Sequence, residues 1–285
     1  MQKFVVEQNE TSRLDIFLVS KIPELSRSSI AKLCSNGKVL INDMKQPTKY
    51  KVKQNDEITV YFDPKDLDEI PNITLPILYE DDDCLVINKP TGVLTHSKGN
   101  FNPEATVATF IRDRIKSMQG DRAGIVHRLD RATSGVIICA KTPDALSWLQ
   151  KQFSARKVKK EYLAMIDGSL KHDEAIIDMP IARNPQSPKT FHVSQTGKQA
   201  KTSYKTIKNE NNHSILELKP ETGRTHQLRV HLAQQGHPIV GDTMYGGSDY
   251  ERLMLHAHKL EITLPNRIRK VFVAPLPKAF TNNKL

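Results

Sequence analysis

The sequence predicts an α+β protein that consists of a small N-terminal domain and a larger second domain. The chain has 285 residues, which is enough for one large domain and a small one. Patterns typical of strands and of helices alternate irregularly along it, which favours a mixed, mostly antiparallel sheet flanked by helices over a doubly wound parallel sheet. The stretch 63–76 has three prolines, several acidic residues and little periodicity, so we expect a linker there.

The first 62 residues carry patterns for two helices followed by strands. Apolar residues recur at helical spacing in 12–22 and again from 28 until Asn36-Gly37, a pair that favours a turn. The stretches 38–42 and 58–62 are rich in β-branched or aromatic residues. We therefore expect a compact module of two helices and a small sheet over 12–62.

The larger domain is expected to begin at 77. Strand patterns cover 77–88, where the acidic run 81–83 interrupts them, and recur at 135–140, 161–166, 200–207 and 214–219. Helical patterns cover 105–116, 143–153 and 225–235. Thr142 and Pro143 supply the cap and first turn of the second helix, and Gly236 can end the third in a left-handed conformation.

The chain is basic, with 42 Lys and Arg against 32 Asp and Glu and a net charge of +10. This excess favours a polyanionic partner or an anionic membrane surface. No run approaches the ~18 apolar residues needed to span a bilayer, and the N-terminus lacks the apolar core of a signal peptide. We therefore expect a cytoplasmic protein with no membrane partner.

The three cysteines, Cys34, Cys84 and Cys139, lie far apart among apolar neighbours. Their spacing supports neither a disulfide framework nor a Cys-x-x-Cys metal site. We expect all three to be buried thiols.

The densest group of polar residues is GIVHRLDRATSG at 124–135, directly before an apolar strand pattern. Within it, Asp130 lies between Arg128 and Arg131. Arginines beside a carboxylate keep it ionised at neutral pH, as a nucleophile or a general base requires. A surface loop of ion pairs would have the same spacing, and the residues alone leave both interpretations open.

A second group is ETGRTHQLRVHL at 221–232, where a glycine turn leads into a predicted helix. His226 and Arg229 are three apart and would share one face of that helix. A helix start with basic residues can hold a phosphate or pair with a buried carboxylate. The alternative is a solvated basic face.

Metal and nucleotide sites have little support in the sequence. His226 and His231 are five apart and do not share a helical face, whereas His256 and His258 would share a strand face. Neither pair has Cys or carboxylate partners at metal-site spacing. Neighbours in the acidic run 81–83 would point to opposite sides of a strand, so a solvated turn is expected there rather than a Mg²⁺ cluster. No glycine-rich phosphate loop occurs, and we expect neither a metal nor a cofactor.

Several separated motifs resemble those of the RluA-type pseudouridine synthases. HRLDRATSG at 127–135 resembles the catalytic motif of that family. The others are EDDDCLVINKPTG at 80–92, KKEYLA at 159–164, TGRTHQLRVHL at 222–232 and GHPIVGD at 236–242. LHA at 255–257 is similar to the closing strand of the family. The resemblance covers about 77–275 and implies a catalytic domain there, with a central cleft.

The N-terminal stretch 12–62 resembles the S4-type RNA-binding domain, through SRLDIFL, SRSSIAKL, GKVLIN and an ITV strand. Arg13, Arg27, Lys32 and Lys38 would form a basic set on or beside its two helices, suited to contacts with RNA phosphates. Each of them alone could equally be a solvated surface charge.

The resemblance implies an isomerase that needs neither a metal nor a cofactor. Asp130 matches the catalytic aspartate of the family, which either attacks the ribose or abstracts its 2′ proton. Tyr162 matches the tyrosine whose ring stacks on the flipped uracil and whose hydroxyl helps to remove the carbon-5 proton. Arg229 matches the basic residue that is paired with the aspartate.

The implied partner is RNA, with large-subunit ribosomal RNA the commonest substrate of this arrangement and transfer RNA the next, and we expect a monomer. Arg128 is expected to occupy the space that the flipped base leaves, and Arg131 and Arg224 to contact RNA or loops. Two other functions stay open: a noncatalytic RNA-binding or ribosome-assembly factor with the same fold, and a metal-dependent nuclease built on the acidic run 81–83.

Overall fold

The computed structural model describes residues 1–7, 10–25, 27–62, 72–97, 104–115, 117–118, 122–210 and 212–280. These residues form two compact units. The first contains the described residues up to 73 together with those of 96–110 and 119–122, and the second contains the rest. Most of the predicted linker, 63–76, lies outside the described residues.

The first unit has an antiparallel sheet in the order β1-β4-β2-β3 and two helices. The strands are β1 (Gln2–Val5), β2 (Val39–Ile41), β3 (Met44–Lys45) and β4 (Glu57–Val60), and the helices are α1 (Leu14–Lys21) and α2 (Arg27–Ser35). Both predicted helices and both predicted strands are confirmed. The sequence patterns missed β1 and β3, which are short and largely exposed.

The second unit is built on one large sheet. Among the described residues it has nine strands in the order β5-β6-β7-β14-β8-β13-β12-β9, with β15 paired to β14. Of the pairs in that sheet, β7 with β14 is parallel and the others are antiparallel, which confirms the predicted mixed, mostly antiparallel sheet. The strands are β5 (Ile77–Glu80), β6 (Cys84–Lys89), β7 (Ser134–Ala140), β8 (Lys159–Asp167), β9 (Glu174–Asp178), β12 (Lys201–Glu210), β13 (His213–Pro220), β14 (Leu255–Thr263) and β15 (Arg269–Val273).

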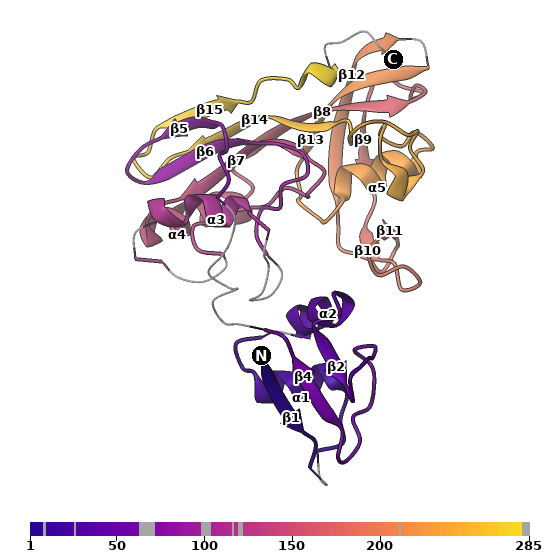
Figure 1. The fold of residues 1–285 in the computed structure, drawn as a ribbon. Helices are drawn as coiled ribbons and strands as arrows, with labels where there is room; N and C mark the ends of the chain where they lie inside the picture. The colour runs from indigo at the N-terminus through magenta and orange to yellow at the C-terminus, as the bar shows by residue number, and fades with distance from the viewer. Residues whose placement is uncertain are drawn as a thin grey trace. The chain divides into compact units, whose positions relative to one another are not determined.

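The remaining elements are short. They are α3 (Val107–Ile111), α4 (Pro143–Ser154), α5 (Gln227–Gln234), the hairpin strands β10 (Ile181–Arg183) and β11 (Phe191–Val193), and the 3₁₀ turns at 112–114, 243–245 and 278–280. In Figure 1, α4 lies near the β5–β7 end of the sheet and α5 near the other end. The predicted helix over 105–116 is shorter than expected, because the chain changes to a 3₁₀ turn at Arg112.

The start of α4 follows the predicted chemistry. The Thr142 side chain accepts a hydrogen bond from the backbone N–H of Ala145, and Pro143 occupies the first turn, where its missing N–H costs nothing. Among the described residues no helix combines the length and apolar character that crossing a membrane requires.

The core of the second unit has β7 at its centre, with all seven residues buried. Val136, Ile138 and the apolar face of α4 belong to one apolar cluster, which also includes Cys84. Cys34, Cys84 and Cys139 are free and buried, as predicted. The loop that carries the densest polar motif leads directly into this buried strand.

Candidate active site

A cavity of about 110 Å³ lies between the loop before β7, the strand β8 and the start of α5. Six of the residues singled out in the sequence line it: Arg128, Asp130, Tyr162, Arg224, His226 and Arg229. These residues are up to about a hundred positions apart, and the β7-β14-β8-β13 order of the sheet brings their elements together.

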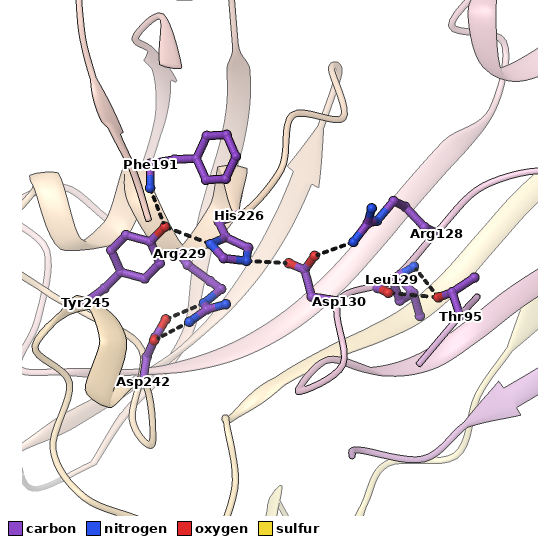
Figure 2. Close-up of polar contacts among 9 residues, drawn as sticks. All are labelled: Thr95, Arg128, Leu129, Asp130, Phe191, His226, Arg229, Asp242 and Tyr245. Carbon is purple, nitrogen blue, oxygen red and sulfur yellow. Dashed lines mark hydrogen bonds and ion pairs between the residues drawn. The ribbon is translucent and has the colours of Figure 1, made fainter. Parts of the chain in front are cut away.

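The loop that carries Asp130 is held in place by the segment after β6. The Thr95 hydroxyl donates to the carbonyl of Leu129 and accepts from the N–H of the same residue, at 2.8 and 3.1 Å (Figure 2). The Gly92 N–H donates to the carbonyl of Arg131 at 2.9 Å. Because these bonds hold the backbone on both sides of Asp130, its position is set before any substrate binds.

Lys89 supplies a further attachment. Its side chain is fully buried, and Nζ donates to the carbonyls of Pro90, Val93 and Arg131. Burial lowers the pKa of Lys89 to about 7, although the charge of Asp130 acts in the opposite direction. The lysine therefore ties the end of β6 to the loop of Asp130.

Two histidines hold the two ends of the loop, at 127 and at 134. His127 Nε2 accepts from the backbone N–H of Ile138 at 3.1 Å, and its ring stacks on Phe153. His256, in β14, lies 2.8 Å from the Ser134 hydroxyl through Nδ1. Burial lowers the pKa of His127 to about 3 and that of His256 to about 4, so both are neutral structural groups at neutral pH.

The carboxylate of Asp130 is partly exposed to the cavity and has two nitrogen groups near it. Arg128 Nη2 lies 3.9 Å from Oδ1, and His226 Nε2 lies 3.9 Å from Oδ2 (Figure 2). Both distances exceed normal hydrogen-bond length, so one face of the carboxylate is available to a ligand.

Arg229 does not make the direct pair with Asp130 that we expected. Its Nε and Nη2 donate to the two carboxylate oxygens of Asp242 at 2.7 and 2.6 Å, and both side chains are buried (Figure 2). Its guanidinium also lies 4.9 Å from the ring centre of Tyr245. Burial acts to lower the pKa of Arg229, but Asp242 and the charge of Asp130 outweigh it and raise that pKa. The arginine therefore stays charged at the cavity wall.

Tyr162, in β8, also lines the cavity. Burial, and then the negative charge of Asp130, raises the pKa of its hydroxyl, so the phenol is protonated at neutral pH. Lys160 lies two residues earlier and donates to the carbonyl of Thr222 at 3.2 Å. Burial, with a smaller effect of Arg156, lowers the pKa of Lys160 to about 8.

The start of α5 differs from the sequence prediction. The helix begins at Gln227, and His226 precedes it in a left-handed conformation with φ 57° and ψ 19°. His226 and Arg229 therefore do not share a helix face. The side chain of Gln227 holds the turn at 222–226, because it accepts hydrogen bonds from Thr222 Oγ1 and from the Arg224 N–H.

The residues predicted to contact RNA lie in both units. Arg131 is exposed and follows Asp130 in the same loop, and Arg224 donates to the carbonyl of Gln199. In the first unit, Lys32 is half-buried and Lys38 is exposed.

Arg13 and Arg27 have a structural task that the sequence did not reveal. Both donate to the buried carboxylate of Asp15, at 3.0 and 2.7 Å. Since their guanidinium groups remain partly exposed, they can still face a polyanion.

The acidic run forms a turn, as predicted. Asp81 Oδ1 accepts from the backbone N–H groups of Asp83 and Cys84, and the Tyr79 hydroxyl donates to Asp81 Oδ2.

Sequence reasoning gave no role to Thr95, Lys89, Tyr245 or Asp242, and it did not bring His226 to Asp130. Lys89 and Asp242 lie inside the motifs at 80–92 and 236–242. Their place in these motifs is the one feature of the sequence that could have pointed to a role. Tyr245 lies three residues after the end of one of those motifs, and only the fold brings it to His226.

Comparisons with known proteins identify the family of the chain. The family model described as RNA pseudouridylate synthase matches residues 83–234, and the S4 domain model matches 12–58. The ribosomal large subunit pseudouridine synthase D of Borreliella burgdorferi is 38% identical over 98% of this chain and 90% of its own length. The protein of that name from Xylella fastidiosa is 37% identical over 93% of this chain and 86% of its own. A solved structure, human RNA pseudouridylate synthase domain containing 1, matches with a TM-score of 0.61 and 30% identity, covering 73% of this chain and 86% of the human one.

Proposed function

The chain belongs to the RNA pseudouridylate synthase family, and we propose that it converts specific uridines of large-subunit ribosomal RNA to pseudouridine. Family membership makes it an isomerase that acts on RNA. The choice of ribosomal RNA rests on relatives that carry the name of a large-subunit enzyme and align over most of their length. The S4 domain match and the net charge of +10 support a polyanionic partner.

The reaction breaks the bond between ribose carbon 1′ and uracil nitrogen 1, turns the base and joins carbon 1′ to uracil carbon 5. The carbon-5 proton then leaves and nitrogen 1 takes up a proton, so the product is an isomer and no co-reactant is consumed. The target nucleotide must first leave its stack, because the reacting bond cannot be reached in a helix. Such a site needs a carboxylate, a ring for stacking and positive charge.

Asp130 is the proposed catalytic carboxylate. The observation that carries this assignment is that Asp130, Tyr162 and Arg229 line one cavity, although they come from three separate elements. Asp130 either attacks carbon 1′ or takes the 2′ proton so that uracil is released, and both routes need the anion. Arg229 contributes a fixed positive charge at the wall of the same cavity.

Tyr162 is the proposed stacking and proton-transfer residue. Its ring supplies the flat surface on which the extruded uracil can stack. Since its hydroxyl is protonated at rest, it can accept the carbon-5 proton only while passing on its own. Asp130 lines the same cavity and can receive that proton once its bond to the sugar is broken or its captured proton is returned.

The remaining assignments concern RNA binding and organisation. We assign RNA binding to an S4 domain over 12–62, a linker to 63–76 and catalysis to 77–275, with Arg128 filling the space of the flipped base. Arg131, Arg224, Arg13, Arg27, Lys32 and Lys38 are the proposed contacts to RNA. We further propose that the protein acts as a monomer in the cytoplasm.

The test is isomerisation of ribosomal RNA taken from cells that lack the gene, with EDTA in the reaction. We expect the purified protein to restore pseudouridine at the large-subunit positions that those cells have lost. Conversion of transfer RNA alone would contradict the proposed substrate. Tight binding without conversion would instead support a noncatalytic RNA-binding factor.

A further inference from the structure

The two ring nitrogens of His226 face two different polar groups of the site. Nδ1 lies 2.8 Å from the hydroxyl of Tyr245, and Nε2 lies 3.9 Å from Asp130 Oδ2 (Figure 2). The imidazole thus stands between the carboxylate and a tyrosine that does not itself approach Asp130 within hydrogen-bonding distance in any described contact.

The hydrogen bonds around Tyr245 favour one tautomer of His226. The backbone N–H of Phe191 donates to the Tyr245 oxygen at 2.9 Å. That contact uses a lone pair of the oxygen and leaves the phenolic hydrogen available for His226 Nδ1. A neutral imidazole that accepts at Nδ1 must carry its hydrogen on Nε2. The opposite tautomer would turn the Nε2 lone pair toward the carboxylate, which is electrostatically unfavourable.

The surroundings hold the ring in this position. Phe191 and Tyr245 meet the imidazole edge-on, with ring centres 5.5 and 5.6 Å away. The left-handed backbone of His226 is unfavourable for a residue with a Cβ atom, yet it points the ring into the site. Strain of this kind persists only where neighbouring contacts over-determine the conformation.

The charge state of the ring agrees with a neutral donor. Five titratable or charged groups face it: Asp130, Arg128, Arg229, Asp242 and Tyr245. Burial lowers the pKa of His226, and the two arginines act in the same direction, whereas the two carboxylates partly oppose them. A neutral Nε2–H can bond to Asp130 without cancelling the negative charge that the reaction needs.

We propose that Tyr245 is a positioning residue for the reaction: it fixes the tautomer and orientation of His226, so that Nε2–H is directed at Asp130 and donates to it in the RNA complex. Closing the present distance to hydrogen-bond length requires a shift of about 1 Å. The role of the bond rests on the proposed function of Asp130, but the tautomer itself does not.

The direct test is nuclear magnetic resonance of the full chain labelled with ¹⁵N-histidine, without RNA. Loss of one signal set in His226→Gln assigns the residue. We expect His226 to carry its hydrogen on Nε2 in the parent protein. In Tyr245→Phe, which keeps the ring and removes the hydroxyl, we expect a mixture of tautomers and a changed titration midpoint. A parent protein with the hydrogen on Nδ1 would overturn the proposal without any variant.

The matched control is Tyr204→Phe. Tyr204 is also buried, and its hydroxyl also makes a hydrogen bond, to the carbonyl of His172 at 3.2 Å. This variant should leave the His226 signals unchanged. A Tyr245→Phe spectrum with the parental tautomer and midpoint would contradict the proposal, and the chemical-shift dispersion of the other histidines shows whether the variant is folded.

Kinetics then test the consequence. In single-turnover isomerisation, Tyr245→Phe should lower the rate roughly tenfold and His226→Gln about 10²-fold, the usual cost of removing a preorganised donor. RNA affinity should stay within twofold for both. Equal losses of affinity and rate would make the pair an RNA-binding element instead. If the parent protein showed the expected tautomer but no isomerisation, the proposed function would fail and the positioning of His226 by Tyr245 would stand.

Discussion

Tyr162 has a ring and a hydroxyl in the cavity, and the two parts can be tested separately. In Tyr162→Phe the ring remains, so stacking worth about 1 to 3 kcal/mol per base should survive and RNA affinity should barely change. If the hydroxyl relays the carbon-5 proton, the single-turnover rate should fall by about 10²-fold or more. Binding and single-turnover rates should both be measured, because steady-state turnover would merge the two effects.

Two outcomes would change the assignment of Tyr162. Lost affinity would make it a binding or folding residue, whereas an unchanged rate would confine it to stacking. The Tyr204→Phe variant serves again as the control, since it removes a buried tyrosine hydroxyl away from the cavity.

At the scale of single residues, the sequence predicts which residues form the site but not the hydrogen bonds and ion pairs among them. Asp130 and Tyr162 stand inside recognisable motifs, and the structure brings both to one cavity. The sequence could not predict the ion-pair partner of Arg229, because Asp130 and Asp242 both lie in recognisable motifs. Only the fold decides that the guanidinium reaches Asp242. Helical spacing predicts His226 inside the helix, because such spacing does not reveal a left-handed residue just before a helix.

At the scale of elements, β7 and β14 approach closely at Gly135. The backbone of Gly135 has φ +118°, and a Cβ atom there would lie 2.6 Å from the backbone nitrogen of Ala257. In Gly135→Ala the two parallel strands must separate next to the loop of Asp130. Backbone strain of about 1–3 kcal/mol and overpacking of about 1–3 kcal/mol should add.

The measurement for this prediction is urea unfolding followed by the fluorescence of Trp148, the single tryptophan of the chain, which lies in α4 of the second unit. The control is Gly236→Ala, because Gly236 has a similarly positive φ of +82° but nothing within 4 Å of its Cβ position. In that variant the free energy of unfolding should fall only by the cost of the backbone strain. Equal losses in the two variants would show that the close approach of the strands does not matter.

Periodicity identified the elements whose patterns are long and regular, such as α4, β7 and β13. It missed β9, β10, β11 and β15, since these strands are short and several of their residues are exposed. It also could not pair β7 with β14, which lie more than a hundred residues apart in the chain. That parallel pair is what places the loop of Asp130 beside β8.

At the scale of the whole molecule, the N-terminal module is proposed to add RNA affinity. Removal of residues 1–70 should leave a folded catalytic unit that binds RNA more weakly. Phosphate contacts release counterions, so the affinity of the shortened protein should also depend less steeply on salt concentration. Titration of both proteins with the same RNA at several salt concentrations measures the two slopes. Equal slopes and affinities would show that the module has a different task.

The composition of the chain predicts only the broad class of its binding partner. A net charge of +10 predicted a polyanionic partner, and the family resemblance supplied the isomerase and the central sheet. The order of the strands could not be derived, because it depends on contacts between distant segments and not on local pattern.

The central claim is that the charge of Asp130 drives the isomerisation, and Asp130→Asn tests it most directly. The substitution keeps the volume and hydrogen-bonding capacity of the side chain but removes the negative charge on which both chemical routes depend. With RNA that carries tritium on uracil carbon 5, turnover releases tritium to water, and RNA binding can be measured on the same sample. We predict parental binding and fold, with no release above background. Release within tenfold of the parent would contradict the account.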